Sequence, residues 1–183
     1  MAVKCIALDM DRTTLDAQGK LSKENKEALL YAIKKGVHVC IASGRAFSAL
    51  PEDDIRAFIL THSGELSSMD IIVKDEERKE KIWALLEKSV KDIYITSSIQ
   101  QLIEISGKNS GKHNGLKFLS DLIGISLQET AAFGDADNDV EMLEIAGIGI
   151  AVANGSEKAL AAADMITSHH DENGVAEGIY KLL

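Results

Sequence analysis

The sequence lacks an apolar stretch of the roughly 18 residues that a membrane-spanning helix requires. It also lacks a secretory pattern, because the first residues run directly into the apolar segment VKCIAL. Only two cysteines occur, Cys5 and Cys40, and both lie inside apolar runs, which favours buried, reduced thiols over a disulfide. These absences predict a cytoplasmic protein with no membrane partner.

Basic residues are also scarce. The chain has 20 lysines and arginines against 29 acidic residues, so its net charge is −9, and no basic run stands out. This balance argues against a nucleic-acid partner but not against a small phosphorylated ligand, because local charge decides there. With 183 residues, 45% of them hydrophobic, the chain is expected to form one domain with a modest insert.

Short apolar runs alternate with helical patterns along most of the chain. Helices are expected from Ser22 to Gly36, around Leu116–Ile123, from Val140 to Gly147, at Ser156–Ala162 and at Gly174–Leu182. Buried strands are expected at Val3–Leu8, Val37–Ala42, Ala57–Thr61, Thr130–Phe133, Ile148–Val152 and Met165–Thr167. This order predicts an α/β fold, with a Rossmann-like parallel sheet covered by helices on both faces.

Residues 64–107 have a different pattern. A strand at Met69–Val73 precedes a charged helix that carries Trp83, and two more strands follow at Ile93–Thr96 and Leu102–Ile105. The pattern predicts a small α+β insert in a core formed by residues 1–63 and 108–183.

Three predicted strands end in polar residues, at the sheet edge where open parallel sheets bind ligands. The segments are DMDRT from Asp9, SGR from Ser43 and GDADND from Gly134. One acidic residue at a strand end is usually a turn or cap residue, but several converging carboxylates repel one another by about 4 kcal/mol per pair at 4 Å. Such a cluster needs protonation or a cation, and hard oxygen ligands favour Mg²⁺ beside a phosphoryl group.

These motifs resemble those of the haloacid dehalogenase superfamily, in its Cof-like branch of phosphatases. Asp9-Met10-Asp11-Arg12-Thr13 is similar to the first motif of the superfamily, and Ile41-Ala42-Ser43-Gly44-Arg45 is similar to the second. Lys112 resembles the third motif, and Gly134-Asp135-Ala136-Asp137-Asn138-Asp139 resembles the fourth. The four motifs occur in the order typical of the family.

The resemblance implies a Mg²⁺-dependent phosphatase for a small phosphorylated metabolite such as a sugar phosphate. Asp9 would be the nucleophile and would form an aspartyl-phosphate, while Asp11 would act as general acid and then as general base. The implied metal residues are Asp9, Asp11 through its backbone carbonyl, Asp135, and Asp139 at the ion or just beyond its ligands. The implied phosphate-binding residues are Ser43, Gly44, Lys112 and Asn138.

Several features depart from the family pattern. Arg12 and His113 stand where glycine is usual, and the insert is shorter than the usual cap of this branch. The resemblance therefore implies a reduced cap, with a more open site or a second copy of the chain closing it. Three other functions stay open: a catalytically impaired scaffold, a phosphomutase and a phospho-receiver domain. His169-His170 could bind a metal, but a pair of this kind more often lies in a solvent loop.

Overall fold

The computed structural model describes residues 2–42 and 68–183. The chain divides into two compact units, one of residues 1–43 and 111–183 and one of residues 44–110. The predicted strand Ala57–Thr61 and the predicted core boundary at residue 63 lie outside the described residues. No described helix is both long enough and apolar enough to cross a membrane.

The first unit contains a five-stranded sheet in the order β2-β1-β6-β7-β8, and every neighbouring pair of strands is parallel. This confirms the predicted parallel sheet. Its strands are β1 (Cys5–Leu8), β2 (His38–Ile41), β6 (Thr130–Gly134), β7 (Ile148–Val152) and β8 (Met165–Thr167).

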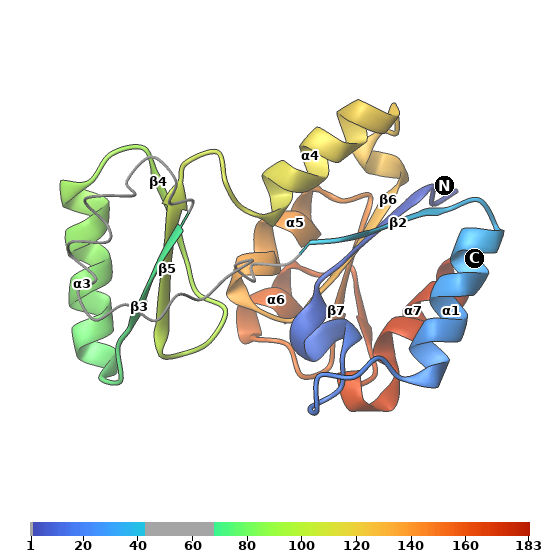
Figure 1. The fold of residues 1–183 in the computed structure, drawn as a ribbon, viewed down its shortest axis with the longest axis horizontal. Coiled ribbons are helices and arrows are strands. Elements are labelled where there is room, and N and C mark those ends of the chain that lie inside the picture. The colour runs from blue at the N-terminus through green and yellow to red at the C-terminus, as the bar shows by residue number, and fades with distance from the viewer. Residues whose placement is uncertain (1, 43–67) are drawn as a thin grey trace. The chain divides into compact units, whose positions relative to one another are not determined.

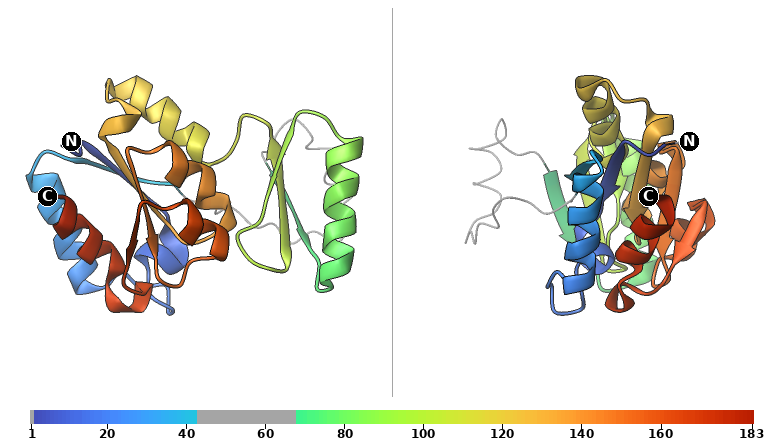
Figure 2. Two further views of the ribbon diagram at one scale, coloured as in Figure 1. Left: turned by 180° about the vertical axis from the view of Figure 1, so that it is seen from behind. Right: turned by 90° about the vertical axis from the view of Figure 1, so that its right-hand side faces the viewer.

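Helices cover both faces of this sheet (Figures 1 and 2). Ile6 and Leu8 of β1 face the side where α1 (Lys23–Lys34) and α7 (Gly174–Leu182) pack against each other. Between them, Ala7 faces the other side, which α4 (Lys112–Ile123), α5 (Val140–Ile145) and α6 (Glu157–Ala162) cover. Because alternate residues of a strand point to opposite faces, β1 is apolar along its whole length and fully buried.

The ends of the helices follow from local sequence signals. The Ser22 hydroxyl accepts a hydrogen bond from the backbone N–H of Asn25 at the start of α1, and Ser156 caps α6 in the same way. Gly124 ends α4 in the left-handed conformation that glycine adopts without steric cost. Single 3₁₀ turns lie at Leu127–Glu129, Asp137–Asp139 and His170–Glu172.

The described part of the second unit is a small antiparallel sheet with one helix. β3 (Ser68–Ile72), α3 (Glu76–Ser89), β4 (Ile93–Thr96) and β5 (Leu102–Gly107) follow one another, and the strand order is β3-β5-β4. Val73 and Ile103 are its buried apolar residues among those described, while α3 buries none of its own. This confirms the predicted strand–helix–strand–strand pattern.

Asn25 links three segments of the core. Its side-chain N–H₂ donates to the carbonyl of Thr14 at 3.0 Å, and its oxygen accepts from the backbone N–H of Ala176 at 2.9 Å. The side chain is buried, so removing it leaves two backbone groups without these partners. We expect Asn25→Ala to lower the free energy of unfolding by about 2–4 kcal/mol, measured by urea denaturation. Lys26→Ala, on the exposed neighbour, should change it by less than about 0.5 kcal/mol; equal effects would contradict this role.

Candidate active site

The candidate site lies where β1 and β6 end side by side. After β1 the chain moves to β2 on one side, whereas β6 lies on the other side of β1. Loops that leave two neighbouring strands in opposite directions open a crevice at their carboxyl ends, and ligands of open α/β sheets bind there. Asp9 directly follows β1 and Asp135 directly follows β6, so the sheet itself brings these carboxylates together.

A buried lysine joins two of the acidic residues. The Lys112 ammonium donates to Oδ1 of Asp9 at 2.5 Å and to Oδ1 of Asp139 at 2.6 Å. Lys112 is the first residue of α4, and the exposed fraction of its side chain is only 8%. An ammonium group has three donors, so these two ion pairs leave one N–H for a further ligand.

The other oxygen of Asp139 organises the chain after β6. Oδ2 accepts hydrogen bonds from the backbone N–H groups of Asp135 and Ala136, each at 3.0 Å. Asp139 is completely buried. Both of its oxygens are therefore engaged, one by Lys112 and one by the backbone, which suits a residue that holds other groups in place.

Asp135 also bonds with the loop Met10–Thr14 that follows Asp9. The Thr13 hydroxyl donates to Oδ1 of Asp135 at 2.9 Å, and the Thr14 hydroxyl donates to the carbonyl of Asp9 at 2.6 Å. These contacts order the loop. Both threonines are buried, so the loop is fixed from within.

The site contains three carboxylates that are poorly solvated, and this shifts the pKa values of its residues. Burial, and then the charge of Asp139, raises the pKa of Asp9 to about 7, although Lys112 opposes the rise. Burial also raises the pKa of Asp135, against the hydrogen bond from Thr13. For Lys112, burial would lower the pKa, but the charges and hydrogen bonds of Asp139 and Asp9 outweigh it and raise the pKa. The site therefore holds more negative charge than one lysine balances.

The donor set fits a small hard cation. One oxygen from each of Asp9, Asp135 and Asp139 lies within 4.8 Å of the others. Two ligands on opposite sides of a Mg²⁺ ion lie about 4.2 Å apart, so a small contraction would suffice. The side-chain oxygen of Asn138 is buried and lacks a hydrogen-bond partner among residues 2–42 and 68–183. This unpartnered oxygen fits a hydrated ion, because water bound to the ion could donate a hydrogen bond to it.

Not every predicted site residue joins this cluster. Asp11 is exposed, and its carboxylate does not belong to the group formed by Asp9, Asp135 and Asp139. Its predicted metal contact is through the backbone carbonyl, and this contact stays a prediction. Ser43 and Gly44 lie outside the described residues, so their predicted contacts with phosphate stay predictions.

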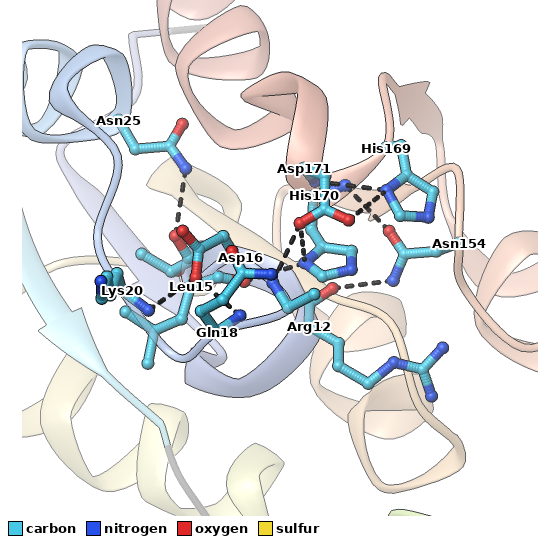
Figure 3. A network of polar contacts seen from close by, with 12 residues as sticks. Arg12, Leu15, Asp16, Gln18, Lys20, Asn25, Asn154, His169, His170 and Asp171 are labelled. Carbon is cyan, nitrogen blue, oxygen red and sulfur yellow. Dashed lines mark hydrogen bonds and ion pairs between the residues drawn. The ribbon is translucent and has the colours of Figure 1, made fainter.

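A polar network that the sequence did not reveal holds the loop from outside (Figure 3). The Asn154 side chain donates to the carbonyl of Arg12 at 2.8 Å and accepts from the backbone N–H of His170 at 3.0 Å. Nδ1 of His170 lies 2.9 Å from the carbonyl of Leu15. Because a carbonyl can only accept, this nitrogen carries the proton. The prediction of a solvent loop was wrong for His170, which is buried.

Gly134 makes room for Asp139. A Cβ atom at residue 134 would lie 2.5 Å from Cβ and 2.8 Å from Oδ2 of Asp139. We expect Gly134→Ala to displace this carboxylate and to lower the free energy of unfolding by about 1–3 kcal/mol, measured by urea denaturation. Gly115→Ala is the control, because no atom lies within 4 Å of its added Cβ and helix α4 should gain about 0.5–1 kcal/mol. A Gly134→Ala chain as stable as the parent would show that Asp139 moves freely.

Comparison with known proteins finds relatives that match this chain in part or over nearly its whole length. A chloroplastic endoribonuclease YBEY of Arabidopsis thaliana is 40% identical over 87 residues, which are 48% of this chain and 15% of that protein. The chain spans only 38% of the length of a second relative, the phosphatase YwpJ of Bacillus subtilis. A phosphoglycolate phosphatase of Archaeoglobus fulgidus is 28% identical over 215 aligned positions, which cover 96% of this chain and 95% of that protein.

The fold agrees with these matches. The structure of a haloacid dehalogenase-like hydrolase from Bacillus subtilis superposes with a TM-score of 0.86, covering 99% of this chain and 100% of that one at 22% identity. The model of the family described as haloacid dehalogenase-like hydrolase matches residues 6–52 and 51–179. These segments contain the acidic cluster, Lys112 and all of the described strands except Cys5 at the start of β1, and the chain belongs to the haloacid dehalogenase-like hydrolases.

Proposed function

We propose that this chain is a magnesium-dependent phosphatase that hydrolyses a small phosphomonoester through an aspartyl-phosphate on Asp9. The observation that carries the proposal is the convergence of three buried carboxylates, from the segments after β1 and after β6, beside a buried lysine that pairs with two of them. A structural role alone gives no reason to bury so much like charge. A phosphoryl-transfer site needs this charge to hold a cation and a nucleophile side by side.

In the first half of the reaction, a carboxylate oxygen of Asp9 attacks phosphorus and the bond from phosphorus to the ester oxygen breaks. Asp11, protonated at the start, gives its proton to the departing oxygen. The exposed position of Asp11, two residues after the buried Asp9, suits a group that meets the leaving alcohol.

In the second half, Asp11 takes a proton from a water molecule as the water attacks phosphorus. The bond between phosphorus and the Asp9 oxygen breaks, which releases inorganic phosphate and restores both residues. Lys112 has one N–H left for a phosphoryl oxygen, and Asn138 is proposed to contact the phosphoryl group as well. Asp139 acts as a positioning residue, since it holds Lys112 and the backbone of Asp135.

Asp9, Asp135 and the carbonyl of Asp11 would hold the magnesium ion, with Asp139 just beyond them. When bound, the ion offsets the negative charge of the carboxylates and of the phosphoryl group. The three carboxylate positions and the buried oxygen of Asn138 support this assignment.

The relatives support a small phosphorylated substrate. The phosphatase of Archaeoglobus fulgidus aligns over nearly all of both chains, and the alignment has more positions than this chain has residues. That relative therefore carries segments without a counterpart here. This fits the proposal that residues 64–107 form a reduced cap on a core of residues 1–63 and 108–183. If the cap is reduced, a second copy of the chain would close the site, and this remains a prediction.

Asp9→Asn should lower Mg²⁺-dependent release of phosphate from an aryl phosphate by at least about a thousandfold, because an amide cannot act as the nucleophile. The measurement is the initial rate with and without Mg²⁺. Asp121→Asn removes an exposed carboxylate from α4 and should leave the rate within about twofold. Activity that persists in Asp9→Asn would exclude this nucleophile, and Mg²⁺ binding without any turnover would favour an impaired scaffold.

Magnesium should stabilise the chain more at pH 8 than at pH 5.5. The pKa of Asp9 is raised to about 7, so without metal its contribution to stability is full below about pH 4 and is lost as the pH rises through 7. The ion binds the ionised carboxylates and reverses this loss. At a Mg²⁺ concentration a hundred times the dissociation constant, the gain is about 2.7 kcal/mol. For a chain of this length this raises Tm by roughly 5–10 °C at pH 8.

At pH 5.5 the rise in Tm should be less than half as large, as thermal unfolding would measure. Asp135→Asn serves as the control, because it removes one proposed ligand and should abolish most of the rise at both pH values. A stabilisation by Mg²⁺ that grows as the pH falls would contradict the assignment of these carboxylates to the ion.

A further inference from the structure

Arg12 has a backbone conformation that arginine rarely adopts. Its φ is 59° and its ψ is 12°, in the left-handed region. Among the residues that the structure describes, two other non-glycine residues have positive φ, Asp92 and Asn173. Aspartate and asparagine tolerate this region because their short polar side chains bond locally, whereas arginine gains nothing of that kind. A disfavoured residue at a fixed position suggests that its side chain has a function.

Hydrogen bonds hold the backbone at and after this position. The carbonyl of Arg12 accepts from Asn154, and the next residue, Thr13, is tied to Asp135 by its hydroxyl. On the far side, the carbonyl of Leu15 is bound by the buried ring of His170 (Figure 3). Glycine would fit this loop without steric cost, so the loop does not require arginine.

The side chain of Arg12 is available for a ligand. It is exposed and extends away from the network of Asn154 and His170 (Figure 3). Within residues 2–42 and 68–183, its guanidinium group forms no hydrogen bond or ion pair. Its charge nevertheless acts on the site: burial raises the pKa of Asp135, and after the hydrogen bond from Thr13 the charge of Arg12 opposes that rise.

The position in the loop indicates which part of a substrate Arg12 would meet. Asp11, the preceding residue, must lie within hydrogen-bond reach of the leaving oxygen if it protonates it. The leaving group therefore begins beside Asp11 and Arg12. Asp9 and Asp139 engage two of the three N–H groups of Lys112, and the third is assigned to the phosphoryl group, whereas the guanidinium of Arg12 has no partner among residues 2–42 and 68–183.

We propose that Arg12 binds a carboxylate on the leaving-group side of the substrate, so that the preferred substrate is a phosphomonoester that also carries a carboxylate. This rests on the proposed function. The planar fork of a guanidinium group matches a carboxylate with two parallel hydrogen bonds. A single positive charge balances one carboxylate, and without it the acidic cluster would repel such a substrate.

The test compares two ligands that differ in one group, 2-phosphoglycolate and 2-hydroxyethyl phosphate. Binding is measured by calorimetry with Mg²⁺, in the full chain carrying Asp9→Asn so that no ligand is consumed. We expect this chain to bind phosphoglycolate at least tenfold more tightly. Adding Arg12→Gly should remove the preference, and Arg12→Lys, which keeps the charge but not the fork, should retain part of it. Lys4→Gln removes a charge from the opposite edge of the sheet and should leave the preference intact.

Arg12→Gly should melt at the same or a higher temperature than its parent, so a lost preference cannot be attributed to unfolding. The inference is overturned if the preference survives Arg12→Gly, if the parent shows none, or if the parent binds neither ligand. Its outcome is independent of turnover. A wild-type chain that releases no phosphate from any ester, yet prefers phosphoglycolate through Arg12, would refute the proposed function and keep the assignment of Arg12.

Discussion

The arrangement of the core depends on the repulsion between carboxylates that the parallel sheet brings together. Asp9 and Asp135 follow neighbouring buried strands, and Asp139 lies close to both with no exposed surface. One buried lysine offsets part of this charge, and the backbone N–H groups after β6 offset another part. Burial, together with the remaining negative charge, raises the pKa of Asp9 and makes the site receptive to a cation. The chemistry of the site thus begins with an electrostatic imbalance that the fold maintains.

Much of the fold follows from periodicity in the sequence. The strands Ile148–Val152 and Met165–Thr167 and the helix Gly174–Leu182 begin and end where the apolar patterns and glycines predict. These signals are local: a buried strand is apolar along its length, and a cap or a left-handed glycine marks a helix end. The sequence also predicts that the acidic motifs lie together, because parallel strands bring their carboxyl ends to one edge of the sheet.

What the sequence could not reveal are contacts between distant segments. Asn25, Asn154 and His170 look like ordinary polar residues, and nothing near them in the sequence indicates a buried partner. Their partners lie 11 to 155 residues away, at Thr14, Ala176, Arg12 and Leu15. The separate roles of the acidic residues could not be read from the sequence either, because only the structure shows that both oxygens of Asp139 are engaged.

The pairing of β1 with β6 has a consequence for how the chain folds. Cys5 pairs with Thr130, so this central pair forms only after a very long stretch of chain has been brought round. Closing such a loop costs entropy before any contact compensates for it, and sheets built from remote strands fold slowly. Asp9 and Asp135 lie at the ends of these two strands, so the ability to bind an ion should form together with the completed sheet. A fluorescent or calorimetric signal of metal binding would therefore report the last stages of folding.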